Sequence, residues 1–179
     1  MTKIFNNNVT IKSIILALKK KIMSIEIERK FLVKNSSFKE KGVKCLHIKQ
    51  GFLNSDKNRV VRIRIVGDKG FITIKGKSSK NGLSRFEWEK EINLQEAESL
   101  FDLCEVGVIQ KKRYLINHKS SLYEVDVFLG ENDGLIIAEV ELKSETELFS
   151  KPQWLGEEVT GIAKYYNSEL SRNPFKNWA

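Results

Sequence analysis

Residues Ile25-Glu26-Ile27-Glu28-Arg29-Lys30-Phe31 alternate charged side chains with apolar or mixed ones. Successive side chains of a β-strand point to opposite faces, so Glu26, Glu28 and Lys30 would share one face. Two carboxylates and an ammonium group are costly to bury unless they are paired or bind a ligand. The stretch therefore predicts a strand whose charged face either meets water or binds a metal ion and an anion.

The same alternation recurs along most of the chain. We expect strands at 25–33, 46–54, 59–66, 70–76, 84–92, 110–117, 121–128 and 135–142, separated by turns rich in Asn, Asp, Gly and Lys. Acids and bases segregate by strand, as in Arg62-x-Arg64, Lys111-x-Arg113, Glu124-x-Asp126 and Glu139-x-Glu141. A solvated sheet face would explain any one strand. It explains the segregation less well than a barrel whose lumen holds carboxylates beside cations.

Helical signals are fewer. Asn93 resembles an N-cap, and the apolar residues after it recur at helical spacing until Gly107. Further short helices are expected near 143–150 and from about 162 to 172, with a short turn at 35–41. The fold class we predict is mainly β (α+β), with peripheral helices around the strands.

Composition fits one domain in a chain of 179 residues, 41% hydrophobic and 30% charged. We divide it into an N-terminal extension, 1–22, disordered or loosely docked, and a tunnel-like domain, 23–179. The extension holds five lysines and no acid, so most of the net charge of +8 belongs to it. We therefore expect no nucleic-acid partner. Its apolar run, 14–18, is too short to span a membrane.

Two distant cysteines, Cys45 and Cys104, favour a reduced, cytoplasmic protein. With two histidines in the chain, a metal ion would bind carboxylates, which favours Mg²⁺ or Mn²⁺. Arginine and lysine at this density suit a polyanion such as a short chain of phosphates. The expected partner is a triphosphate-containing small molecule, and a homodimer is left open.

These motifs resemble the CYTH, or triphosphate tunnel metalloenzyme, superfamily, whose signature Glu-x-Glu-x-Lys corresponds to Glu26, Glu28 and Lys30. The resemblance covers about residues 23–170. It continues in order through Arg62-x-Arg64, Lys75, Gly82-Leu83-Ser84-Arg85, Glu87, Lys111-x-Arg113, Glu124-x-Asp126, Glu139-x-Glu141, Trp154-Leu155-Gly156-Glu157-Glu158-Val159-Thr160, Lys164 and Tyr165.

The resemblance implies an eight-stranded antiparallel β-barrel forming a tunnel open at both ends, with a function like that of small bacterial inorganic triphosphatases. Two carboxylates, Glu87 and Glu89, would hold cationic residues in place. The implied metal ligands are Glu26, Glu28, Asp126, Glu139 and Glu141. The implied phosphate-binding residues are Lys30, Arg62, Arg64, Lys75, Lys111, Arg113 and Lys164. Of these, we predict that Lys30 and Lys111 also take part in catalysis.

One residue departs from the family pattern. Small bacterial members often carry Gln-Gly-Tyr-Leu, whose tyrosine has been assigned as a proton acceptor, whereas this chain has Gln50-Gly51-Phe52-Leu53. Phe52 has no hydroxyl group, so either the metal ion alone activates water, or another residue such as Lys111 takes part, or the activity is low. The first hypothesis is metal-dependent hydrolysis of inorganic triphosphate or a related triphosphate. The alternatives are an adenylate cyclase or a nucleoside or thiamine triphosphatase of the same fold, and a non-catalytic polyphosphate-binding module.

Overall fold

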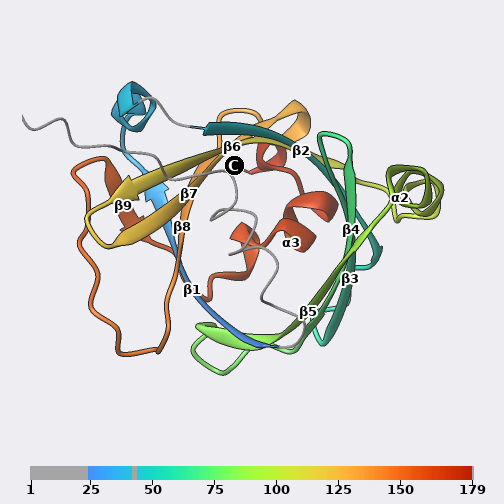
Figure 1. Cartoon of the computed structure of the whole chain (residues 1–179), viewed down its shortest axis with the longest axis horizontal. Helices are drawn as coiled ribbons and strands as arrows, with labels where there is room; N and C mark the ends of the chain where they lie inside the picture. The colour runs from blue at the N-terminus through green and yellow to red at the C-terminus, as the bar shows by residue number, and fades with distance from the viewer. Residues whose placement is uncertain (1–23, 42–43, 179) are drawn as a thin grey trace, which may run out of the picture.

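Eight antiparallel strands close into a barrel in the computed structural model, which describes residues 24–41 and 44–178 (Figure 1). The predicted extension, 1–22, lies outside the described residues. The strands are β1 (Ser24–Val33), β2 (Lys44–Asn54), β3 (Arg59–Val66), β4 (Lys69–Gly76), β5 (Ser84–Ile92), β6 (Ile109–His118), β7 (Ser121–Leu129), β8 (Ile136–Glu141) and the short β9 (Leu155–Glu158).

The barrel closes through β1, which pairs with both ends of the sheet. Residues 24–27 pair with β5 and residues 28–32 pair with β8, so the order runs β1-β5-β4-β3-β2-β6-β7-β8 and returns to β1. Each neighbouring pair is antiparallel, as short turns between consecutive strands require. The predicted fold class is confirmed. The short β9, which adds to the end of β1, was not predicted.

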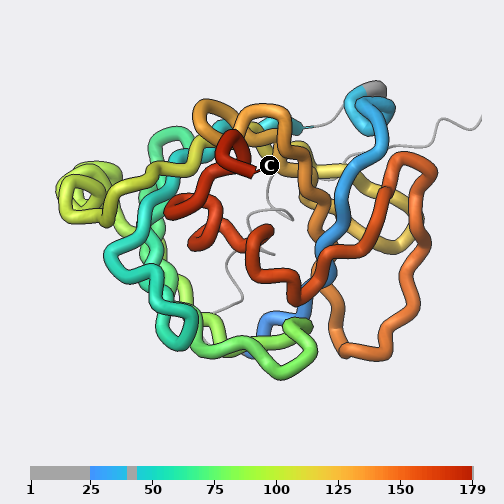
Figure 2. Tube along the Cα trace, turned by 180° about the vertical axis from the view of Figure 1, so that it is seen from behind, coloured from blue at the N-terminus to red at the C-terminus, as the bar shows by residue number. Residues whose placement is uncertain are grey.

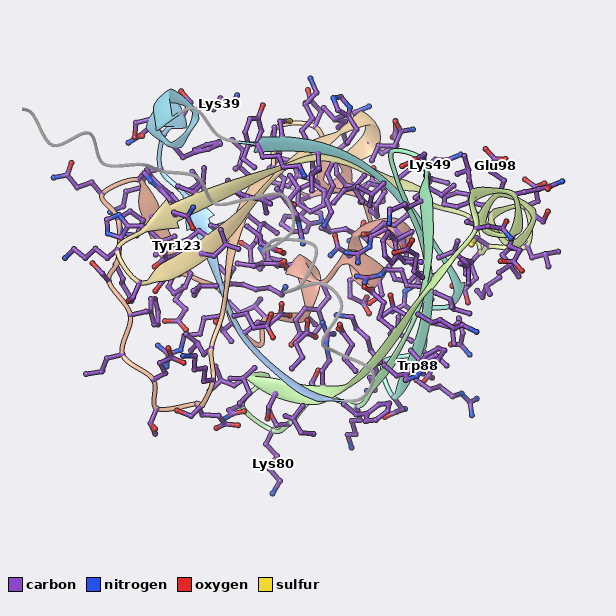
Figure 3. The ribbon with its side chains drawn as sticks, viewed as in Figure 1. Lys39, Lys49, Lys80, Trp88, Glu98 and Tyr123 are labelled. Carbon is purple, nitrogen blue, oxygen red and sulfur yellow. The ribbon has the colours of Figure 1, made fainter. Side chains whose placement is uncertain are left out.

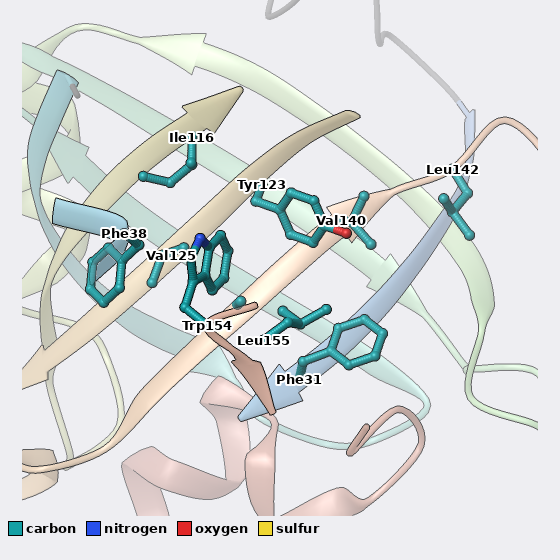
Figure 4. Close-up of a cluster of buried hydrophobic side chains, with 10 residues drawn as sticks. Phe31, Phe38, Ile116, Tyr123, Val125, Val140, Leu142, Trp154 and Leu155 are labelled. Carbon is teal, nitrogen blue, oxygen red and sulfur yellow. The ribbon is translucent and has the colours of Figure 1, made fainter. Parts of the chain in front are cut away.

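The larger apolar core lies on the outer face of the barrel wall. Figure 4 shows this cluster, in which Trp154 packs edge-on against Tyr123 at 5.4 Å between ring centroids and against Phe38 at 5.9 Å. The hydroxyl group of Tyr123 donates to the carbonyl oxygen of Ser150 at 2.8 Å. Phe38 belongs to the 3₁₀ helix η1 (Ser36–Lys41), where a turn was expected. The core therefore secures β1, β7 and β8 from outside.

A second cover of the outer wall is helix α2 (Leu94–Phe101). Asn93 caps it as predicted, because its side chain accepts from the backbone N–H of Glu96 while Glu96 reaches back to the N–H of Asn93. Gly70 of β4 allows the close contact, since a Cβ there would lie 2.3 Å from the Cβ of Ala97. The helix thus packs on the strands on the side away from the lumen.

The C-terminal segment covers one end of the barrel (Figure 2). The single helix expected at 162–172 is divided into the 3₁₀ helix η3 (Ala163–Tyr165) and helix α3 (Asn167–Arg172). Leu170 of α3 is fully buried in a cluster with residues from the barrel wall. That cluster consists of Phe52, Val60, Ile109, Phe128, Leu135, Ile137 and Leu170. The C-terminal segment therefore packs against the wall at this end of the barrel.

The helix expected at 143–150 is wrong, because this segment is a loop. Its Glu145 carboxylate accepts hydrogen bonds from the side chains of Asn81 and Ser84, which holds the loop against the turn before β5. Leu148 is 95% exposed, whereas Phe149 packs edge-on against Phe31 at 6.0 Å between ring centroids, so the segment contacts the core through a single aromatic side chain rather than a helical face. Two further 3₁₀ turns are η2 (Gly130–Asn132) and η4 (Phe175–Asn177). Among the described residues, no helix is long and apolar enough to cross a membrane.

Candidate active site

Charged side chains from seven strands share the inner face of the barrel. Cross-strand register partners point to the same face, and the pairs Glu26–Arg85, Lys30–Glu139 and Arg113–Asp126 link neighbouring strands around the wall. The lumen residues are Glu26, Glu28, Lys30, Arg62, Arg64, Thr73, Lys75, Arg85, Glu87, Glu89, Lys111, Arg113, Glu124, Asp126, Glu139 and Glu141. The barrel arrangement inferred from the alternating charges is therefore present.

Asp126 is the most deeply buried carboxylate of the lumen, with 1% of its side chain exposed. Arg113 donates to both of its oxygens, from Nε and Nη2, at 2.6 Å each, and Lys111 Nζ donates to Oδ2. Burial acts to raise the pKa of Asp126, but Arg113 and Lys111 outweigh it, so the pKa lies below its ordinary value. The carboxylate is therefore ionised and holds two cations in fixed positions.

Lys30 joins the carboxylates of β1 to those of β8. Its Nζ donates to Glu139 Oε1 and lies 3.1 Å from Glu28 Oε1. Burial acts to lower the pKa of Lys30, but Glu139 and Glu28 outweigh it and the net pKa is raised. Lys30 is therefore a permanent cation in the wall of the lumen, suited to stabilising negative charge.

Arg85, which was quoted as part of the motif but not assigned to the site, links the two carboxylates of β1. Its Nε donates to Glu26 Oε2 at 3.0 Å and its Nη2 donates to Glu28 Oε1 at 3.2 Å. Lys75 Nζ also donates to Glu26 Oε2, at 2.9 Å. The sequence signal that could have identified Arg85 as a site residue is its spacing: it lies two residues before Glu87, on the same charged face of β5.

Glu89 holds the two arginines of β3, as expected. Arg64 Nη2 donates to both carboxylate oxygens at 2.9 Å, and Arg62 Nη2 donates to Oε2 at 3.2 Å. The hydroxyl group of Thr73 donates to the same Oε2 at 2.6 Å. Glu87 makes the corresponding ion pair with Lys75. These two carboxylates orient cations, which confirms the structural role expected for them.

Lys111 differs from Lys30 because its pKa is lowered rather than raised. Burial lowers its pKa to about 8, against the opposing effect of Asp126. Its Nζ is also 3.4 Å from the side-chain oxygen of Asn167 on α3. Lys111 therefore sits between the β-barrel wall and the helix that covers it.

The predicted metal ligands are placed around the inner wall, but they do not converge. Within the ranges 24–41 and 44–178, no three carboxylate, histidine or cysteine side chains form a metal-binding group. Glu26, Glu28, Asp126 and Glu139 each bind lysine or arginine. Their chemistry nevertheless fits a hard divalent cation, because Glu28 and Glu141 are register partners and supply oxygen donors from adjacent strands.

Lys164 lies apart from the ion pairs of the lumen. It is exposed, and its Nζ is 4.7 Å from the ring centroid of Trp178 and 5.1 Å from that of Tyr165. This position places the ammonium group in an aromatic environment on the C-terminal segment. The other six predicted phosphate-binding residues, by contrast, belong to the lumen set.

Comparisons with known proteins identify the family and the fold. The sequence profile described as CYTH domain matches residues 24–171. An inorganic triphosphatase of Acetivibrio thermocellus is 46% identical over 157 residues, which cover 87% of this chain and 99% of the relative. An inorganic triphosphatase of Nitrosomonas europaea is 37% identical over 150 residues, covering 82% and 96%. The crystal structure of an inorganic triphosphatase superposes with a TM-score of 0.60 at 33% identity, covering 82% and 93%.

Proposed function

The chain belongs to the CYTH domain family, and on this basis we propose that it is a hydrolase that removes the terminal phosphate of inorganic triphosphate. The observation that carries the proposal is the closed lumen, in which lysines and arginines of five strands face carboxylates of the same wall. Such a surface suits a compact polyanion better than an extended or apolar ligand.

The charges of the lumen support a divalent metal ion as a second component. Cations and carboxylates are present in nearly equal number and already neutralise one another, so the lumen lacks surplus positive charge for a triphosphate. A Mg²⁺ or Mn²⁺ ion would supply that charge. Its ligands would be Glu26, Glu28, Asp126, Glu139 and Glu141. When bound, such an ion stabilises negative charge on phosphoryl oxygens and favours ionisation of water.

The cationic residues of the lumen bind and orient the substrate. Their N–H donors would contact the phosphate chain beside a metal ion that the carboxylates Glu26, Glu28, Asp126, Glu139 and Glu141 would hold. The residues concerned are Lys30, Arg62, Arg64, Lys75, Lys111 and Arg113. Arginine offers paired donors to phosphoryl oxygens, and a fixed cation stabilises the charge that develops during phosphoryl transfer.

Two lysines have distinct catalytic roles. Lys30 keeps its charge across the working pH range, because two carboxylates raise its pKa. It therefore provides constant electrostatic stabilisation of the transferring oxygens. Lys111, with a pKa of about 8, can hold or release a proton near the operating pH. Phe52 contributes no proton-transfer group, because its side chain is a hydrocarbon, and it is buried among apolar neighbours.

A phosphate-release panel tests the proposal and its alternatives. The purified protein is assayed with tripolyphosphate, ATP and thiamine triphosphate, each with Mg²⁺ and with Mn²⁺. We expect the fastest turnover with tripolyphosphate and none in EDTA. Formation of cyclic AMP from ATP would instead indicate a cyclase. Tight binding of tripolyphosphate without release of phosphate would indicate a binding module. A cytoplasmic location belongs to the same proposal, supported by the unpaired thiols of Cys45 and Cys104.

A further inference from the structure

Gln50 is the polar residue that β2 contributes to the middle of an otherwise apolar inner face. Its flanking neighbours on that face are Ile48 and Phe52. The residues between them point outward, since Lys49 Nζ lies 4.3 Å from the ring centroid of Phe101 on α2 (Figure 3). A Cβ on Gly51 would likewise meet the side chains on the α2 side. Gln50 therefore points into the lumen.

The amide group of Gln50 is buried without a hydrogen-bond partner. The residue is 0% exposed, and neither its Nε2 nor its Oε1 is bonded to any residue that the structure describes. Buried polar side chains nearly always have partners, because an unpaired amide loses its hydration without compensation. A side chain of this kind in a substrate-binding lumen is consistent with a partner that the substrate supplies.

Two arginines beside Gln50 have unused donors as well. Arg64 is the register partner of Gln50 on β3, and Arg62 follows two residues earlier on the same face. The Nε atoms of both guanidinium groups are buried and unpartnered, while their Nη2 atoms donate to Glu89. Burial and the neighbouring Arg62 lower the pKa of Arg64, as expected where two cations share too little negative charge.

We propose that Gln50 is a further substrate-binding residue, whose Nε2 donates a hydrogen bond to a phosphoryl oxygen held by Arg62 and Arg64. The identity of the substrate rests on the proposed function. The three side chains supply unpartnered N–H donors on the same inner face of two adjacent strands, which suits an anionic oxygen with several lone pairs. The neutral amide adds a donor without adding to the repulsion between the two arginines.

Equilibrium binding tests this role without requiring turnover. Calorimetry would measure the affinity for diimidotriphosphate, a triphosphate analogue that resists hydrolysis, in the presence of Mg²⁺. Gln50→Leu removes both amide atoms at similar size, and Gln50→Glu replaces the donor with a carboxylate. The matched control is Gln110→Leu, which changes an exposed glutamine on the adjacent strand β6.

We expect Gln50→Leu to weaken binding roughly 10- to 100-fold, as loss of a hydrogen bond to a charged group does. Gln50→Glu weakens it further, because a carboxylate repels the phosphate. Gln110→Leu binds like the wild type. The unfolding midpoint of Gln50→Leu equals or exceeds that of the wild type, since the amide has no protein partner to lose. A structural glutamine would instead lower it.

Equal affinity of Gln50→Leu and wild type for the analogue would overturn the role of Gln50, whatever the enzyme activity. Absence of binding by the wild-type protein would overturn both this role and the proposed function. Binding that depends on Gln50, in a wild-type protein that releases no phosphate from tripolyphosphate, would support the role of Gln50 and refute only the proposed hydrolysis.

Discussion

Glu28 and Glu141 are register partners on the adjacent strands β1 and β8, so two carboxylates lie directly opposite each other on the lumen wall. Like charges in this position repel each other, and Lys30 and Arg85 offset part of the repulsion at Glu28. A divalent cation bound by both carboxylates would offset more of it. The pairing thus connects the folding stability of the barrel with metal binding.

The first prediction concerns this pair. Addition of Mn²⁺ or Mg²⁺ should raise the thermal unfolding midpoint. At a metal concentration one hundred times the dissociation constant, the free energy of unfolding should rise by about 2.7 kcal/mol. The double variant Glu28→Gln/Glu141→Gln should lose most of this gain. Differential scanning fluorimetry with and without EDTA measures it. The control is Glu98→Gln on the exposed surface of α2. An undiminished metal effect in the double variant would refute these ligands.

A second prediction concerns Glu89 and acid stability. Burial acts to raise the pKa of Glu89, but Arg64 and Arg62 lower it below its ordinary value. The ionised carboxylate therefore stabilises the fold above the unfolded-state pKa of about 4.3, and this contribution is lost as the pH falls through the lower folded-state pKa. Glu89→Gln should be less stable than the wild type by about 3 kcal/mol at pH 7 and by much less at pH 3.

Urea denaturation across this pH range measures the difference, and Glu91→Gln is its control. Glu91 lies two residues further along β5, where it pairs with Lys69 at 2.8 Å, and about half of each side chain is exposed. An exposed pair contributes about 0 to 1 kcal/mol. If the Glu89→Gln difference stayed constant from pH 7 to pH 3, the ionised carboxylate would not be its cause.

A third prediction concerns the helix that covers the barrel. Leu170 is 0% exposed and packs against Phe52, Ile109 and other residues of the wall. Leu170→Ala should cost about 2 to 5 kcal/mol, through lost burial and the cavity left behind. Leu148→Ala, at a leucine that is 95% exposed, should change stability by less than about 0.5 kcal/mol. Equal effects of the two substitutions would show that α3 is not packed into the barrel end.

The fold could be predicted from sequence because side-chain alternation is a local property with a period of two. It fixed the strands to within a few residues, and segregation of charge by strand indicated a shared inner face. The four-residue β9 is too short to show this alternation. It forms by pairing with the end of β1, which is a tertiary contact that local sequence does not indicate. The loop at 143–150 was misjudged because Glu145 bonds to the distant turn before β5 rather than to its own segment.

The sequence predicted which residues form the candidate site, but not which of them contact one another. Register decides which charges meet, and it is set by closure of the barrel through β1. Arg85 therefore emerged as the link between Glu26 and Glu28 only in the structure. Gln50 belongs to the Gln-Gly-Phe-Leu motif, but a sequence does not show which buried amides lack hydrogen-bond partners. Lys164 lies with Trp178 because the C-terminal segment folds back on itself, which no local pattern indicates.

Phosphorus NMR of tripolyphosphate hydrolysis tests the central claim most directly. The wild-type protein with Mg²⁺ or Mn²⁺ should convert each tripolyphosphate into one orthophosphate and one pyrophosphate. Glu28→Gln should slow this conversion by at least about a hundredfold, as loss of a group that supports phosphoryl transfer does, while Glu98→Gln leaves it unchanged. Unaltered tripolyphosphate with both metals, or full activity of Glu28→Gln, would contradict hydrolysis in the charged lumen.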